Sequence, residues 1–116
     1  MQGKTVVITG ATSGIGQVAA VALARRGARI VFVARDRRRA ERTLQALRAA
    51  APDPDHRFHV ADLSRLSEMK RVAAEIGGTE QKIDVLINNA GAMFAARQMT
   101  EEEDYFYDRK ISEWTT

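Results

Sequence analysis

The chain has 116 residues, of which 45% are hydrophobic, 28% charged and 6% aromatic, and this composition excludes a disordered tail, a collagen-like repeat and a membrane bundle. The net charge of +3 does not by itself indicate nucleic acid, and the absence of cysteine excludes a disulfide or a Cys-based zinc site. The first apolar run is too short for a signal peptide, and no stretch could span a bilayer. We therefore expect one cytoplasmic domain that binds no membrane.

Apolar runs and helical patterns alternate along most of the chain. Strands are predicted over Thr5–Thr9, Arg29–Ala34, Arg57–Ala61 and Ile83–Ile87, and helices over Ile15–Arg26, from the cap at Asp36 to the turn at Pro52, and over Ser64–Ile76, ended by Gly77 and Gly78. This βαβαβαβ order predicts an α/β fold, an open doubly wound parallel sheet (Rossmann-like) of about four strands with helices on both faces. Ligands of such sheets bind beyond the carboxyl ends of the strands.

The end of the chain differs in composition from the rest. The 19 alanines all precede Arg97, an acidic run follows at Glu101–Asp104, and four of the seven aromatic residues lie in the last 12 positions. We therefore predict a domain over residues 1–100 and a divergent C-terminal tail over residues 101–116.

A glycine-rich turn lies between the first predicted strand and the first predicted helix. A pyrophosphate needs backbone N–H groups pointing at it, and a helix N-terminus supplies them with a partial positive charge. Gly10 would allow the sharp turn, Gly14 would let the backbone approach phosphate, and Gly16 would let the helix pack closely on the sheet. The alternative is a flexible loop, whereas a Walker-type motif is excluded because no Gly-Lys-Ser/Thr follows. The candidate phosphate-binding residues are Thr9, Gly10, Thr12, Ser13, Gly14, Ile15 and Gly16.

The TGxxxGIG spacing of this turn, together with Asn88-Asn89-Ala90-Gly91 after the fourth predicted strand, resembles the short-chain dehydrogenase/reductase family. The resemblance covers the chain from Lys4 to about Thr100, as an N-terminal, cofactor-binding half, and the stretches ARRGARIVFVARD and INNAGAM look closest to its retinol-dehydrogenase-like branch. It implies an NAD(P)-dependent oxidoreductase acting on alcohols or carbonyl compounds.

The resemblance also implies roles for residues at two further strand ends. Asp62 would accept a hydrogen bond from the adenine amino group and Leu63 would flank the ring, although an aspartate at this point is also typical of a helix cap. Asn89 and Ala90 would lie against the adenosine ribose, and Gly91 would let the backbone pass closely. We interpret Asn88 as a structural residue that ties neighbouring loops together.

The end of the second predicted strand bears on cofactor choice. NAD-binding sites of this kind carry an acidic residue there that holds the ribose hydroxyls. This chain has Ala34 followed by Arg35, whose guanidinium can bind a 2′-phosphate, and we predict NADP with NAD as the second choice. Asp36 is the contrary feature, since it could repel the phosphate or accept from a ribose hydroxyl. We interpret Arg37–Arg39 as a solvated helix face.

The sequence does not favour a metal site or a nucleic-acid interface. His56 and His59 lie three positions apart around a strand, so their side chains should point away from each other, and no carboxylate or cysteine stands at ligand spacing; we predict no metal site. The arginine-rich stretch 35–48 has no aromatic residue and contains Asp36 and Glu41, so we predict no nucleic-acid partner.

No catalytic residue is identified in this chain. The resemblance implies a Ser…Tyr-x-x-x-Lys group, but Tyr105 is followed four positions on by Arg109 and Tyr107 by Ile111, and an arginine keeps its proton. We therefore predict an NADP-binding half that is truncated and inactive alone, with an exposed sheet edge through which it self-associates. The alternatives are a non-catalytic dinucleotide-binding or interaction module and a non-functional fragment.

Overall fold

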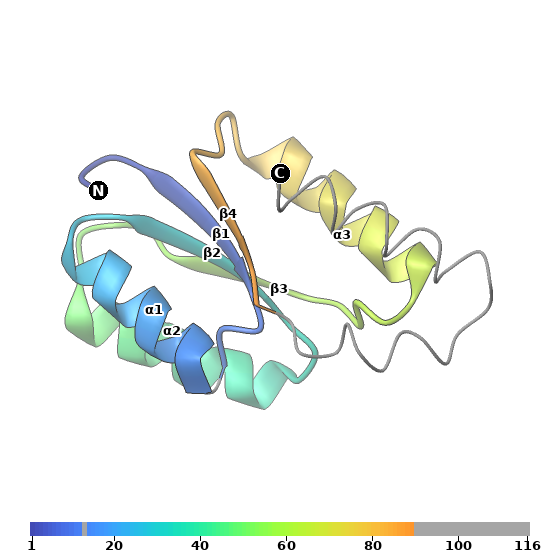
Figure 1. Ribbon diagram of the computed structural model, residues 1–116, viewed down its shortest axis with the longest axis horizontal. Coiled ribbons are helices and arrows are strands. Elements are labelled where there is room, and N and C mark those ends of the chain that lie inside the picture. Colours follow the sequence, from blue (N-terminus) through green and yellow to red (C-terminus); the bar gives the residue numbers. More distant parts are fainter. Residues whose placement is uncertain (13, 90–116) are drawn as a thin grey trace.

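A computed structural model describes residues 1–12 and 14–89, which form a parallel sheet with three helices (Figure 1). The strands lie side by side in the order β3-β2-β1-β4 and all pair in parallel, so the open α/β sheet of about four strands is confirmed. None of the helices in these ranges is long and apolar enough to cross a membrane. The elements are β1 (Thr5–Thr9), α1 (Gly14–Arg25), β2 (Arg29–Ala34), α2 (Arg37–Ala50), β3 (Arg57–Val60), α3 (Leu66–Thr79) and β4 (Val85–Asn88).

The alternation of side chains along the central strands builds two cores, one on each face of the sheet. On one face Ile8 and Phe32 pack against α1 and α2 through residues such as Ala20 and Leu47. On the other face Val7, Val31 and Val33 pack against Val72 and Ile76 of α3. Figure 1 shows this arrangement, with α1 and α2 on one side of the sheet and α3 on the other. The predicted helices on both faces are therefore confirmed.

The bounds of β1 and β2 match their predictions, and α2 follows its predicted cap, Asp36. Helix α1 begins and ends one residue earlier than predicted, and α3, β3 and β4 also differ from their predictions. The sequence pattern predicts that the third helix ends before Gly77 and Gly78, but α3 continues through both glycines to Thr79. Both glycines are exposed, and the end of the helix is held by tertiary contacts of Glu80, which outweigh the low helix propensity of glycine. Strand β3 stops at Val60, one residue early, and β4 is shifted to Val85–Asn88.

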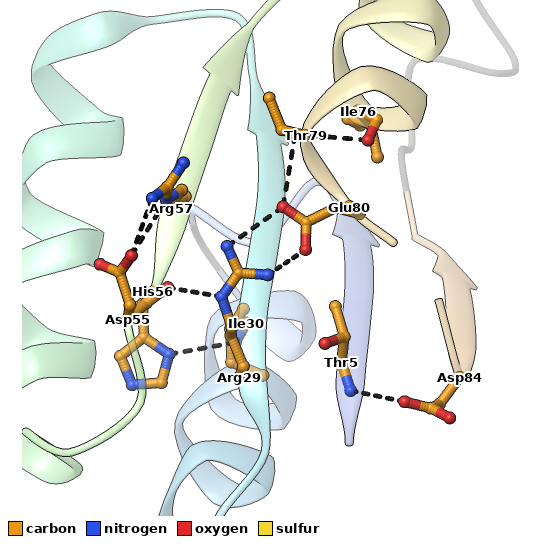
Figure 2. A network of polar contacts seen from close by, with 10 residues as sticks. All are labelled: Thr5, Arg29, Ile30, Asp55, His56, Arg57, Ile76, Thr79, Glu80 and Asp84. Carbon is orange, nitrogen blue, oxygen red and sulfur yellow. Dashed lines mark hydrogen bonds and ion pairs between the residues drawn. The ribbon is translucent and has the colours of Figure 1, made fainter. Parts of the chain in front are cut away.

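The amino ends of the strands are joined by a network of polar side chains (Figure 2). Arg29 at the start of β2 forms a bidentate ion pair with Glu80, whose side chain is only 3% exposed. The Nε of Arg29 donates to the carbonyl of Asp55. Asp84 accepts from the backbone N–H of Thr5 at 2.8 Å. This bond, and then the charge of Lys82, hold the pKa of Asp84 below its ordinary value. These contacts fix where β1, β2 and β4 begin.

His56 belongs to the same end of the sheet and is buried. Its Nδ1 accepts from the Ile30 N–H at 3.0 Å, and its Nε2 lies 2.9 Å from the Ala51 carbonyl. Because an N–H only donates and a carbonyl only accepts, the ring is neutral with its proton on Nε2. His56 thus joins the end of α2 to the start of β2, and burial lowers its pKa.

Candidate functional site

The glycine-rich turn connects β1 to α1 at the carboxyl end of the sheet, between the neighbours β2 and β4. Gly10 and Gly14 both have positive φ angles, 69° and 58°, which residues with a Cβ rarely adopt. Gly14 starts α1 and is exposed, and no atom of residues 1–12 or 14–89 lies within 4 Å of the position that a Cβ would take there. Gly14, at the start of α1, is therefore exposed at the point where the strand order reverses.

Gly16 has the opposite surroundings. It is buried, and a Cβ there would lie 2.1 Å from the Gly10 carbonyl oxygen and 2.5 Å from the Asn89 side-chain nitrogen. The predicted role of Gly16, close packing of the helix against the end of the sheet, is thus visible in the structure. Within this motif Thr12 is half-buried and Ile15 is 81% exposed. Ser13 lies outside the described residues.

Thr9 ties the ends of β1 and β4 together. Its hydroxyl donates to the Asn88 side-chain oxygen at 3.0 Å and accepts from the Asn89 N–H at 3.0 Å. The structural role predicted for Asn88 is confirmed. Asn89 also donates from its side chain to the Gly10 carbonyl at 3.4 Å, so the residue directly after β4 supports the glycine turn. Ala90 and Gly91 lie outside the described residues, as does the predicted tail.

Arg35 and Asp36 follow β2 and differ in how they are engaged. Asp36 is the N-cap of α2 and accepts from the N–H groups of Arg38 and Arg39. Arg35 is exposed, and within the described residues its guanidinium makes no hydrogen bond or ion pair. Arg37–Arg39 are exposed as expected, although Arg37 also lies over the Phe58 ring, 5.7 Å from its centroid. The structure therefore leaves Arg35 available at the end of β2.

Asp62 follows β3 and shapes the turn before α3. Its Oδ1 accepts from the backbone N–H of Ser64 at 3.1 Å and from the Ser64 hydroxyl at 2.6 Å. These bonds, with smaller contributions from the positive charges of Arg35 and Arg65, lower the pKa of Asp62. The actual N-cap of α3 is Arg65, which makes no side-chain capping bond, so Asp62 organises the turn rather than capping the helix.

Asp62 Oδ2 accepts no hydrogen bond from any residue in 1–12 or 14–89, so it can receive a donor from a ligand. Leu63 packs against the core on the α3 face. Sequence reasoning missed Glu68 and Arg71 of α3, which contact the backbone on both sides of Ala61. Their i,i+3 spacing is a signal for an ion pair, but it does not reveal a contact with another strand. Among the described residues no group of three potential metal ligands occurs.

Comparison with known proteins identifies the family. The model of the short chain dehydrogenase family matches residues 4–112. The chain belongs to the short-chain dehydrogenase family. A Streptomyces (strain C5) protein described as a daunorubicin C-13 ketoreductase is 44% identical over 103 residues, which cover 88% of this chain and 35% of that protein. Human retinol dehydrogenase 13 is 38% identical over 100 residues, covering 86% and 30%. The chain thus spans about a third of the length of these curated relatives.

Solved structures of this family match the fold. The Pseudomonas aeruginosa RhlG/NADP active-site complex superimposes with a TM-score of 0.75 at 30% identity, covering 90% of this chain and 43% of that one. An NADH-dependent reductase, A1-R′, complexed with NAD gives a TM-score of 0.68 at 38% identity, covering 79% and 38%. The match to the amino-terminal part of this family, with retinol dehydrogenases among its relatives, agrees with the resemblance predicted from the sequence.

Proposed function

We propose that this chain binds a nicotinamide dinucleotide at the carboxyl ends of β1, β2 and β3, as the cofactor-binding part of an oxidoreductase acting on alcohols or carbonyl compounds. The observation that carries the proposal is the glycine turn: Gly14 stands at the exposed start of α1, and the described residues leave open the space that a Cβ would take there. Backbone N–H groups at a helix start bind phosphate well. The pyrophosphate would lie there, with the adenosine directed toward β2 and β3.

The remaining side chains fit the two ends of an adenosine. Asp62 is held ionised with Oδ2 available, which suits the amino group of an adenine ring. The Arg35 guanidinium makes no hydrogen bond or ion pair within the described part of the chain, and Asp36 uses its carboxylate to cap α2. A 2′-phosphate beside Arg35 would therefore meet a guanidinium rather than an unpaired carboxylate. On this basis the chain prefers NADP to NAD.

The proposed activity of this chain is binding without turnover. Reduction of a carbonyl by a dihydronicotinamide needs a proton donor beside the carbonyl oxygen. Neither Tyr105 nor Tyr107 is followed four positions on by a lysine that could lower its pKa. Incubation with NADPH and a broad panel of carbonyl compounds tests this: turnover above the buffer rate that is abolished by Tyr105→Phe would overturn the proposal.

A cytoplasmic location stays a prediction.

The binding proposal is tested by calorimetric titration with NADPH. Gly14→Asp places a carboxylate at the phosphate position and should abolish binding while the domain stays folded. The matched control is Gly3→Asp, because Gly3 precedes β1 but also has a positive φ, 75°, and no atom of the described residues within 4 Å of its Cβ position. Equal NADPH affinity in the Gly14 and Gly3 variants would contradict the proposal that phosphate binds at Gly14.

Cofactor preference is tested separately. Arg35→Asp should weaken NADPH binding relative to NADH by about 1–3 kcal/mol, the range for hydrogen bonds to a charged group. Arg42→Asp makes the same charge change at an exposed position in the middle of α2 and should leave the NADPH/NADH ratio nearly unchanged. If both variants shift the ratio equally, Arg35 has no specific contact with the 2′-phosphate.

The second candidate function is self-association through the β4 edge. Within the described residues β4 is an outer strand, and its Val85 and Leu86 are 37% and 40% exposed. An unpaired parallel edge with apolar side chains can pair with a second copy. Sedimentation at increasing concentration should then show reversible dimers, reduced by Leu86→Lys. A monomer at all concentrations would eliminate this function.

A further inference from the structure

Two side chains of α3 hold the backbone at the end of β3. Arg71 Nη2 donates to the Val60 carbonyl at 2.8 Å, and Glu68 Oε1 accepts from the Asp62 N–H at 3.4 Å. The two side chains are also joined to each other, by Arg71 Nε to Glu68 Oε2 at 2.9 Å and Arg71 Nη2 to Glu68 Oε1 at 3.1 Å. We call Glu68 and Arg71 the β3 clamp.

The position of β3 in the sheet explains why such a clamp matters. Among the described strands β3 pairs only with β2, so its other side has no backbone partners. The last contact with β2 is the Ala61 N–H to the Ala34 carbonyl at 2.9 Å. On either side of Ala61, the Val60 carbonyl and the Asp62 N–H are bound by the clamp instead. The backbone that carries Asp62 is therefore fixed from two directions, by β2 and by α3.

Arg71 has a further partner that makes no such backbone contact. Its Nη1 lies 2.5 Å from Glu75 Oε2, one turn further along α3. Exposed ion pairs along a helix contribute little to stability. Loss of the Glu75 carboxylate would remove an ion pair of Arg71 but no hydrogen bond to the end of β3. Glu75→Gln is therefore a matched control for the clamp variants.

We propose that Glu68 and Arg71 are positioning residues that hold Asp62 where its carboxylate can accept from the amino group of an adenine ring. This inference rests on the proposed function, because it needs a bound adenine dinucleotide. The guanidinium of Arg71 also lowers the pKa of Glu68, so the acceptor for the Asp62 N–H stays ionised at neutral pH. Because the clamp residues bind the backbone at Val60 and Asp62, their effect on binding would pass through Asp62.

The test uses two probes, NADPH and its hypoxanthine analogue, in which an oxygen replaces the adenine amino group. Wild type should bind NADPH about tenfold more tightly than the analogue, because only NADPH carries the exocyclic amino group that donates to the Asp62 carboxylate, and the analogue presents a carbonyl oxygen in its place. Arg71→Met and Glu68→Gln should each lose most of this preference by weakening NADPH binding and leaving analogue binding nearly unchanged. Asp62→Asn removes the charged acceptor itself, so it should cause the largest loss of the preference for NADPH among these variants. Arg71→Lys should keep part of the preference, and Glu75→Gln all of it.

Three outcomes overturn the proposal, and they are distinguishable. Equal weakening of both probes by the clamp variants would mean general loosening of the fold, and an unchanged preference would mean that the clamp does not act on Asp62. Failure of the wild type to bind either probe would overturn the proposed function and the clamp together. Circular dichroism of each variant verifies folding, and Glu68→Gln serves if Arg71→Met does not fold.

Discussion

The two ends of the parallel sheet use their polar side chains differently. At the amino end Arg29, Glu80 and His56 bind one another or the backbone, and Arg29 and Glu80 form an ion pair that is largely buried. At the carboxyl end Arg35 is unpaired within residues 1–12 and 14–89, and Asp62 uses one of its two oxygens. Polar groups whose hydrogen bonds are all made within the protein stabilise the fold, whereas polar groups that can accept or donate further hydrogen bonds can bind a ligand. The contrast predicts that substitutions at one end change stability and those at the other change binding.

The largest expected effect separates the two ends most directly. Arg29→Met leaves the buried Glu80 carboxylate without its partner and should lower the free energy of unfolding by about 3 kcal/mol. NADPH affinity of the folded variant should stay close to that of wild type, because Arg29 lies at the amino end. Urea denaturation and calorimetric titration measure the two quantities.

The control for Arg29 is Arg57→Met. Arg57 pairs with Asp55, but the side chains are 52% and 65% exposed, so the loss should stay below about 1 kcal/mol. Equal losses in the two variants would contradict the distinction between a buried and an exposed pair.

The second prediction concerns Gly16, where one substitution should weaken both stability and cofactor binding. Gly16→Ala forces a methyl group against the Gly10 carbonyl and Asn89, and should cost about 2 kcal/mol of stability, as overpacking does. Because the glycine turn must shift, NADPH binding should weaken in the same variant. Unfolding and titration experiments that showed lost affinity at full stability would contradict the close approach of α1 to the sheet.

The third prediction uses pH to act on the amino end alone. The pKa of His56 is lowered in the folded chain, so the unfolded chain binds more protons between the folded pKa and the ordinary value of 6.5. Stability should therefore be complete above pH 6.5 and fall as the pH drops through the folded pKa of His56. Protonation of Nδ1 would remove the acceptor for the Ile30 N–H.

The charged groups acting on His56 determine how this prediction is controlled. Arg29 and Arg48 oppose its protonation and Asp55 favours it. In His56→Gln the fall in unfolding free energy between pH 8 and pH 5.5 should be smaller than in wild type. Identical pH profiles in His56→Gln and wild type would contradict the assignment of this fall in stability to His56.

Much of this fold could be predicted from local patterns. The β-branched run Thr5–Thr9 and the capping aspartate Asp36 each have a signal within a few residues, and the structure has both where expected. Asn88 could be assigned a structural role because it ends a strand beside the glycine turn. The family motifs predicted the candidate site by the same kind of short-range spacing.

The contacts that the sequence did not reveal join distant segments to the backbone. His56 binds the N–H of Ile30, and Arg71 binds the carbonyl of Val60. Since every residue except proline offers the same N–H and carbonyl groups, no pattern of side chains marks these partners. The end of α3 was missed for a related reason: Gly77 suggests a helix end locally, but tertiary contacts extend the helix beyond it.

The smallest expected effect tests that last point and completes the comparison of glycines. Gly77 lies inside α3, where a Cβ would meet no atom within 4 Å in the part of the chain that the structure describes. Gly77→Ala should raise the free energy of unfolding by about 0.5–1 kcal/mol, because alanine loses less conformational freedom in a helix. The same substitution at Gly16 is expected to do the reverse, so the pair separates a glycine required by packing from one that is not. NADPH affinity should be unchanged in Gly77→Ala, measured by titration beside the urea denaturation curve. A loss of stability on Gly77→Ala would mean that α3 ends before Gly77, as the sequence pattern alone suggested.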